Sequence, residues 1–532
     1  MFHPRRAVYA ASCLLAFSFV MAPMAIAGNR NASQLNAQNN PLLMSPIPPA
    51  IELGVKPAKP FEGRVLEVVD LDRTSESQKP ATVSVDNVTL SGNGWNRQWA
   101  IKRAIHPLLK KLDRDNGAIA PAELETRLKD ATQFTPFKLQ GRVVKEEATG
   151  ESTLHLDVYE RQPWQLTLFS DNAGRPGTDL YRAGAQITNN NLLGLGDQLS
   201  ITYSGVTRSQ YATAEYALPP LNRRGGELRF RYLYHNSDID TDYLALRQDP
   251  NTNGTSHIVK AIFTQPLDKQ RHFSLYTHLT YAHLNFERNG YLTYGEDFGH
   301  LITGFKASVP DRLGKTDMDV FYLRGIASDV HLRNYWLING SLSRMTQLPF
   351  QHKLFLKSRF QYANHYQATG LELPLGGFTY GRGYTEGLVN SDRGYAITIE
   401  DQFPIPLLNK VCPWVDKRLR AVAFVDAGQG WLDKTNKRFV AGQSNDSNRT
   451  LVLSSGLGLR ARLTRFMQAY MDFGFVLGSK PDHLEFGSAP RVRIHFGVRS
   501  DLLASHWDKR ENRPFTAYHR HKPHHASSSI TR

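Results

Sequence analysis

Cysteine is almost absent from this chain of 532 residues, which contains only two. So few thiols exclude a disulfide framework and a zinc site built from cysteines. Long apolar runs are also missing beyond the N-terminus, since no later stretch approaches the roughly 20 apolar residues of a membrane-spanning helix. Motifs such as G-x-x-x-x-G-K-[ST], H-E-x-x-H and G-x-S-x-G do not occur. The sequence therefore excludes a helical membrane protein, and we expect neither an enzyme nor a bound cofactor or metal.

Acidic residues are outnumbered, with 49 Asp and Glu against 64 Lys and Arg and a formal net charge of +15. Hydrophobic residues make up 41% and aromatics 11% of the chain, which is enough to bury a core and excludes a disordered protein. The excess of positive charge predicts attraction to the phosphates of lipopolysaccharide or to acidic segments. Salt should weaken that attraction.

Residues 1–27 have the pattern of a secretory signal peptide. Arg5 and Arg6 supply positive charge, residues 13–24 are apolar, and a small-x-small cleavage site ends the segment. Its removal lowers the net charge from +15 to +13 and leaves Cys412 as the single thiol. A membrane anchor is the alternative interpretation. Export makes nucleic acid an unexpected partner.

Two segments have the composition of unpacked chain. Residues 28–80 are rich in Asn, Gln and Pro and predict an extended linker, with residues 31–39 as a candidate plug helix. Residues 501–532 form a tail with five histidines and predict a disordered end rather than a metal site.

Residues 81–162 predict a small α+β domain. The alternation over residues 82–90 indicates a strand. A helix follows with Asn96 as its predicted N-cap, and a second helix opens at Pro121. A hairpin follows over residues 137–159. The order β-α-α-β-β resembles a POTRA domain, the periplasmic module of outer-membrane translocation proteins.

Residues 163–500 alternate between apolar and polar in segments of about ten residues, which is typical of a transmembrane β-barrel. Phe230 and Tyr232 share one face, whereas Arg229 and Arg231 share the other. An arginine facing lipid at mid-depth costs about 2–4 kcal/mol, so we expect the arginines to face the lumen. Sixteen strands are predicted, beginning near Trp164, Leu180, Asp197, Ser209, Glu227, Ser256, Arg271, Phe298, Met318, Tyr335, His352, Gly394, Arg418, Arg449, Met467 and Arg491.

The predicted fold is therefore mainly β: a 16-stranded antiparallel transmembrane β-barrel preceded by a small α+β POTRA domain. Closure into a barrel provides hydrogen-bond partners for the backbone groups of every strand, because a closed sheet leaves no unpaired edge in hydrocarbon. A soluble β-sandwich or propeller is the alternative.

Four stretches in order along the chain carry a family resemblance. They are Ser170-Asp171-Asn172-Ala173-Gly174 followed by Asn191-Leu192-Leu193-Gly194-Leu195-Gly196-Asp197, Gly381-Arg382-Gly383-Tyr384 followed by Asp392-Arg393-Gly394-Tyr395, Phe424-Val425-Asp426-Ala427-Gly428, and Ser455-Gly456-Leu457-Gly458-Leu459-Arg460. Together they resemble the two-partner secretion transporters, the TpsB family of haemolysin and filamentous-haemagglutinin exporters. These belong to the larger superfamily that includes BamA.

Strand alternation places Asp426 and Glu400 on the lumen face, beneath the sixth outward loop. The resemblance implies that this loop folds back as a lid and that Arg382 pairs with Asp426, with Glu400 nearby. A planar guanidinium donates two parallel hydrogen bonds to a carboxylate, and the ammonium group of lysine cannot do so. The candidate lid and lock residues are Arg382, Gly383, Tyr384, Glu400, Phe424, Asp426 and Gly428. The alternative is that Arg382 and Asp426 are ordinary solvated charges.

The resemblance implies an outer-membrane channel of a Gram-negative bacterium that exports a large unfolded partner of the haemolysin or adhesin type without ATP. We expect the POTRA domain and both termini in the periplasm. The monomer is expected to be inserted by the barrel-assembly machinery and to contact lipid and lipopolysaccharide. An assembly or insertion factor of the BamA type and a passive porin are the alternatives. The single POTRA domain departs from the family pattern of two.

Overall fold

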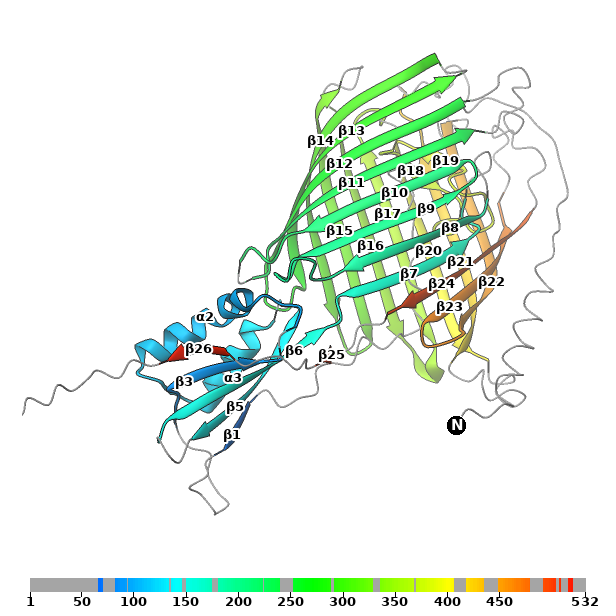
Figure 1. Ribbon diagram of the computed structural model, residues 1–532. Coiled ribbons are helices and arrows are strands. Elements are labelled where there is room, and N and C mark those ends of the chain that lie inside the picture. Colours follow the sequence, from blue (N-terminus) through cyan, green and yellow to red (C-terminus); the bar gives the residue numbers. More distant parts are fainter. Residues whose placement is uncertain are drawn as a thin grey trace, which may run out of the picture.

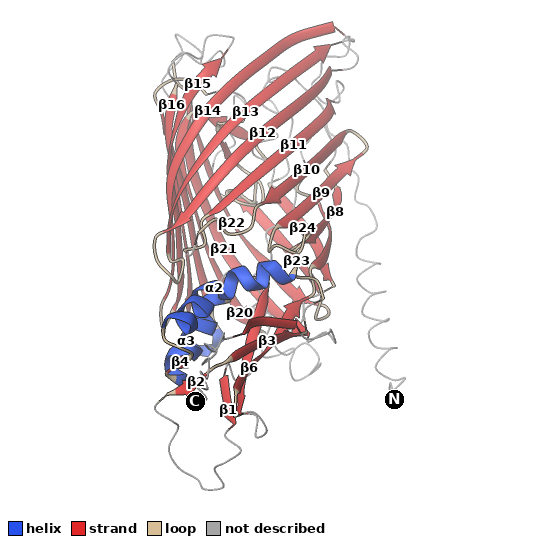
Figure 2. Ribbon diagram, turned by 60° about the vertical axis from the view of Figure 1, so that its left-hand side comes forward, coloured by secondary structure: helices blue, strands red, loops and turns tan. Residues whose placement is uncertain are grey.

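Sixteen antiparallel strands close into a barrel, and a small α+β domain lies at one end of it (Figures 1 and 2). The computed structural model describes residues 66–69, 82–503, 507–508 and 515–519, except residues 93, 134, 146–149, 175–179, 223, 240–251, 289–290, 329–334, 368–369, 406–417, 435–447 and 479–490. The predicted signal peptide, the candidate plug helix, Cys412 and most of the predicted linker lie outside the described residues.

The barrel confirms the predicted fold class and the predicted number of strands. Every strand begins within four residues of its predicted start except β14, which begins seven residues earlier. The strands are β7 (Trp164–Asp171), β8 (Arg182–Asn189), β9 (Gln198–Val206), β10 (Ser209–Ala217), β11 (Glu227–Ile239), β12 (Thr252–Pro266), β13 (Phe273–Arg288), β14 (Tyr291–Pro310), β15 (Gly314–Ser328), β16 (Trp336–Gln347), β17 (Lys353–Ala363), β20 (Arg393–Pro404), β21 (Leu419–Trp431), β22 (Arg449–Arg462), β23 (Met467–Val476) and β24 (Val492–Leu502).

The two faces of the wall differ in polarity as the alternation predicts. Phe230 and Tyr232 on β11 are 46% and 44% exposed on the outer face. Arg229 and Arg231 lie on the opposite face, where both form ion pairs with Glu215 of the neighbouring strand β10. The arginines therefore obtain carboxylate partners inside the barrel and avoid lipid.

The first and last strands pair with each other and complete the ring. β24 and β7 are joined antiparallel from Gly497↔Asp171 to Leu502↔Leu166. Where this register ends, the side chain of Asn172 extends the seam: its amide donates to the Ile494 carbonyl at 2.7 Å and its oxygen accepts from the Phe496 N–H at 2.8 Å.

The α+β domain contains β2 (Val83–Ser84), β3 (Asn87–Ser91), α2 (Gln98–Arg114), β4 (Ala118–Ile119), α3 (Pro121–Ala131), β5 (Phe137–Lys145) and β6 (Ser152–Arg161). The predicted strand over residues 82–90 is divided into β2 and β3. One stripe of α2 is buried against the sheet at the 3–4 residue spacing of a helix: Ile101, Ile105, Leu108 and Leu112. None of the helices described is long and apolar enough to cross a membrane.

Two expectations about unpacked chain are wrong in part. Leu66–Val69 (β1), within the predicted linker, pairs parallel with β5. Trp507–Asp508 (β25) and Phe515–His519 (β26), within the tail predicted to be disordered, pair with β6 and β3. The physical reason is that a three-stranded sheet has two open edges, and each offers unpaired backbone groups to any nearby segment.

Asn96 does not cap α2 as predicted, because the N-cap residue is Arg97 and it makes no side-chain capping bond. Asn96 instead joins the α+β domain to the barrel. Its amide nitrogen donates to the buried carboxylate of Glu160 at 2.8 Å, and its oxygen accepts from the Asn191 amide at 3.0 Å. Asn191 lies in the turn between β8 and β9, whose Gly194 carbonyl also accepts from the Arg97 N–H at 2.9 Å.

The outward face of the wall can be tested at Leu342, which lies near the middle of β16 and is 37% exposed. We expect Leu342→Arg to lower the free energy of unfolding by about 2–4 kcal/mol, because the charge would lie at mid-depth in lipid. Urea unfolding in lipid vesicles measures the effect, with Leu342→Ile as the control. Equal unfolding midpoints for the two variants would contradict the assigned face.

Candidate functional site

The loop between β17 and β20 lies within the barrel and carries the site. It includes a short hairpin of β18 (Leu373–Leu375) and β19 (Val389–Ser391). Leu373 and Leu375 are completely buried and pack with Tyr384 of the loop against Ala396 and Val452 of the wall. This apolar contact holds the loop against β20 and β22, where its tip meets the charged part of the lumen.

The tip of the loop places Arg382 on Asp426 of β21. The Nε atom donates to Oδ2 at 3.0 Å and Nη2 donates to Oδ1 at 2.9 Å, so the guanidinium grips the carboxylate with two parallel bonds. The backbone N–H of Arg382 adds a third bond to Oδ2 at 2.9 Å. Asp426 is fully buried and Arg382 is 2% exposed, so this is a buried ion pair rather than a solvated one.

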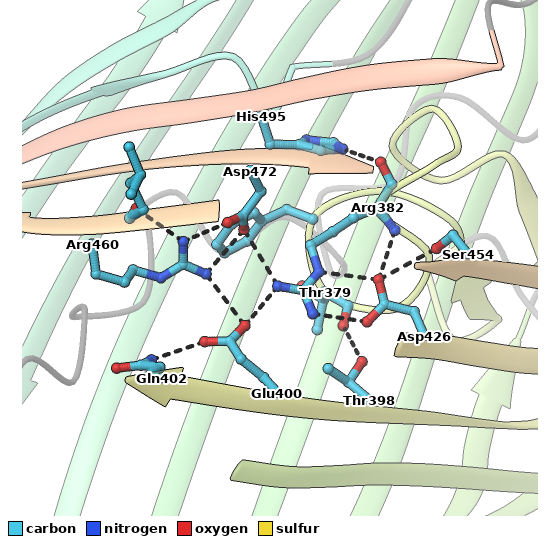
Figure 3. A network of polar contacts seen from close by, with 12 residues as sticks. Thr379, Arg382, Thr398, Glu400, Gln402, Asp426, Ser454, Arg460, Asp472 and His495 are labelled. Atoms are coloured by element: carbon cyan, nitrogen blue, oxygen red, sulfur yellow. Dashed lines mark hydrogen bonds and ion pairs between the residues drawn. The ribbon is translucent and has the colours of Figure 1, made fainter. Parts of the chain in front are cut away.

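Three further charged residues of the wall share this contact (Figure 3). Arg382 Nη1 donates to Glu400 of β20 at 2.6 Å and to Asp472 of β23 at 3.3 Å. Arg460 of β22 donates to Asp472 at 2.5 and 2.9 Å and to Glu400 at 3.2 Å. We call these five residues the lumen network. It contains two guanidinium groups and three carboxylates from the loop and four adjacent strands.

Close packing buries four of the five residues of the lumen network, namely Arg382, Asp426, Arg460 and Asp472. The guanidinium carbon of Arg382 lies 3.3 Å from the centre of the Phe424 ring, a cation–π contact on the face opposite lipid. The carbonyl of Arg382 is within 2.9 Å of the Nε2 atom of His495 on β24. A Cβ atom at Gly474 would lie 2.2 Å from that carbonyl oxygen, so a larger residue on β23 would push the loop out.

The other predicted residues line the same contact. Gly383 lies against Ser454 and the backbone of β23, with no room for a Cβ atom. Tyr384 bonds through its hydroxyl to the backbone of Leu453 at 3.3 Å. Gly428 faces the loop residue Leu375, whose Cδ2 would lie 3.0 Å from an added Cβ atom. The structure thus brings all seven candidate residues to one region of the lumen.

Asp472 was missed by sequence reasoning, and Arg460 was noted only as part of a motif. A signal for Asp472 was present, because it alternates with Met471, Phe473 and Phe475 and must face inward. What alternation could not show is the height of Asp472 relative to Arg382, which depends on the stagger between strands. In the described ranges, no group of three or more His, Cys, Asp or Glu side chains is suited to hold a metal ion.

The family described as haemolysin secretion/activation protein ShlB/FhaC/HecB matches residues 150–460. The chain belongs to this family. Its members are outer-membrane channels of two-partner secretion, and barrel and family together indicate the outer membrane of a Gram-negative bacterium. The family thereby confirms the resemblance inferred from the four sequence motifs.

Solved structures share the fold at low identity. BamA from Haemophilus ducreyi lacking POTRA domains 1-3 is 14% identical with a TM-score of 0.60, over 79% of this chain and 85% of that one. CdiB from Acinetobacter baumannii is 19% identical with a TM-score of 0.58, over 79% and 74%. CdiB from Escherichia coli is 12% identical with a TM-score of 0.54, over 84% and 94%. No curated protein sequence matches the chain.

Removing the Arg382 guanidinium tests the energetic role of the lumen network. Breaking a buried ion pair costs about 3–5 kcal/mol. Arg382→Ala should therefore raise the ratio of undocked to docked loop by more than a hundredfold. We expect a higher conductance in planar bilayers, with Arg382→Lys intermediate because it keeps the charge and loses the fork.

Arg231→Ala is the matched control, since Arg231 is a lumen-facing arginine of β11 that pairs with Glu215 of β10 and lies outside the lumen network. Its conductance should stay close to that of the unaltered protein. Identical traces for Arg382→Ala and the unaltered chain would show that the pair does not hold the loop.

Proposed function

We propose that this secretion channel exports a large unfolded protein of the haemolysin or adhesin type and that the loop over residues 364–392 is its lid. The observation that carries the proposal is the position of Arg382: a loop residue occupies the lumen and is bound there by three wall carboxylates. A lid held by ion pairs can be released when other charged or polar groups replace those contacts. Opening by substrate then needs no nucleotide.

Two carboxylates of the lumen network are shared between two guanidinium groups, which makes exchange of partners feasible. Asp472 and Glu400 each receive bonds from Arg460 as well as from Arg382. If the lid leaves, Arg460 stays paired with both of these carboxylates, whereas among the described residues Asp426 keeps the Ser454 hydroxyl at 3.4 Å as its partner. The cost of opening is therefore concentrated on one pair, Arg382 and Asp426.

The α+β domain is proposed to be a POTRA domain in the periplasm that receives the exported protein. Two features support this orientation. β6 leads directly from the domain into β7, so the domain must lie at the end of the barrel where odd-numbered barrel strands begin. Six of the seven connections at that end have nine residues or fewer, whereas the lid and the two next longest connections, between β21 and β22 and between β23 and β24, leave the opposite rim, as in outer-membrane barrels.

The contact partners of the barrel are proposed from its surface and charge. The apolar outer face fits membrane lipid, and the net charge of +13 that is left after removal of the predicted signal peptide favours the phosphates of lipopolysaccharide. The chain is proposed to be a monomer that depends on the barrel-assembly machinery for its insertion, with no catalytic activity of its own.

An assembly or insertion factor of the BamA type is the second candidate, favoured by the shared barrel fold. The two functions predict different phenotypes. Loss of a secretion channel affects one exported protein, whereas loss of an assembly factor lowers the amounts of many outer-membrane barrels together.

Deletion of the chain in its native host tests the export function directly. We expect one large secreted protein to disappear from the culture medium, while the amounts of other outer-membrane barrels stay constant. Quantitative mass spectrometry of medium and outer membrane measures both. Unchanged release of every large secreted protein would exclude the channel function, and a general fall in barrels would support the assembly function.

Arg382→Ala should lower export at least tenfold, because the lid no longer returns to a defined closed position between substrates. Complementation of the deletion strain measures the effect, with Arg231→Ala as the control. Export at the level of the unaltered chain for both variants would remove the lid from the mechanism.

A further inference from the structure

The sheet of the α+β domain has both of its edges covered by segments from outside the domain. The domain itself supplies the central strands in the order β5-β6-β3. β1, from the segment before the domain, pairs with β5, and β26, from the tail after the barrel, pairs with β3. A bare strand edge binds any extended chain that reaches it, so these two segments decide what else the sheet can bind.

The tail follows a continuous path along this sheet. β25 first pairs antiparallel with the barrel end of β6, at Trp507↔Arg161 and Asp508↔Glu160. β26 then pairs antiparallel with β3, from Phe515↔Leu90 to His519↔Asn87, and so runs away from the barrel. Figure 1 shows β26 in red beside β3 at the far side of the domain from β1.

The pairing of β26 is suited to reversible binding. The strand has only five residues, and its register shifts between Thr516 and Tyr518. Short strands with an interrupted ladder contribute little stability on their own. The tail is, however, tethered to the barrel only thirteen residues before β26, at Leu502, so its local concentration at the edge is about millimolar.

We propose that the β3 edge is a binding site for an extended strand of the exported protein, and that β26 occupies this site until the exported protein displaces it. The inference rests on the proposed export function and adds its regulation. Strand addition to a sheet edge provides affinity through backbone hydrogen bonds, which a tail strand and a partner strand supply equally. Only one of them fits at a time.

The faces of β3 indicate the chemistry of the partner strand. Val88 and Leu90 are completely buried on the side of the helices. Thr89 and Ser91 lie on the open side, where they bond to His155 and Asp157 of β6. A partner strand beside β3 therefore has apolar residues at alternate positions, toward the helices, and small polar residues between them.

A disulfide trap tests whether β26 occupies the edge. Thr89 and Thr516 are directly opposite in the register, and opposite residues of antiparallel strands are close enough for a disulfide. In a Cys412→Ser background, Thr89→Cys with Thr516→Cys should cross-link in the oxidising periplasm. Asn87→Cys with Thr516→Cys, which is out of register, is the matched control and should remain reduced. Absence of the Thr89–Thr516 cross-link would overturn the pairing.

The same variant tests displacement. If β26 must leave, the cross-linked protein should export at least tenfold less than the control variant, and a reductant should restore export. Full export by the cross-linked protein would overturn the inference while leaving the export function intact. Failure of even the unaltered chain to export would instead remove the proposed function.

A binding measurement decides the inference without export. A fluorescent peptide of residues 511–523 should bind the detergent-solubilised chain ending at residue 503 at least tenfold more tightly than the full chain, whose edge is occupied. The control peptide, with Thr516→Pro and Tyr518→Pro, should bind neither, because proline cannot donate to the ladder. Equal binding of the first peptide to both chains, or no binding to the shortened one, would show that β26 does not occupy the edge.

Discussion

Closure of the sheet between β24 and β7 is the constraint on which the rest of the structure depends. In hydrocarbon, an unpaired backbone group costs several kcal/mol, so an open edge is not tolerated. Closure also sorts side chains, because each strand must direct alternate residues to lipid and to the lumen. Charged side chains at mid-depth of the wall are thereby directed into the lumen, where they need ion-pair partners.

The lumen network is a consequence of that sorting. Asp426, Glu400, Asp472 and Arg460 face inward from four adjacent strands and leave an excess of carboxylate. The lid supplies the missing cation through Arg382. A single loop residue thus offsets part of the negative charge of the wall. This explains how a loop of irregular structure is held in one place and why a competing charged chain could release it.

The two wrong expectations about unpacked chain have one cause. The segment containing β1 and the tail containing β26 have the composition of unpacked chain, and their local sequence does not predict a strand. Each becomes a strand because the α+β domain presents an edge beside it. Asn96 is a similar case: its local sequence suits a helix cap, but the buried carboxylate of Glu160 and the amide of Asn191 are stronger partners.

By itself, the sequence determined the number of strands, the face of each strand residue and the inward position of Asp426 and Glu400, because a period of two and the cost of charge in lipid are local properties. The position of Arg382, which lies in a loop, was implied only by the family resemblance. The choice of partners was decided only by the tertiary structure. Whether Arg382 reaches Asp472 as well as Asp426, or β26 reaches β3, depends on strand stagger and on the position of the domain beneath the barrel. Those distances join residues far apart in the chain, and no local pattern encodes them.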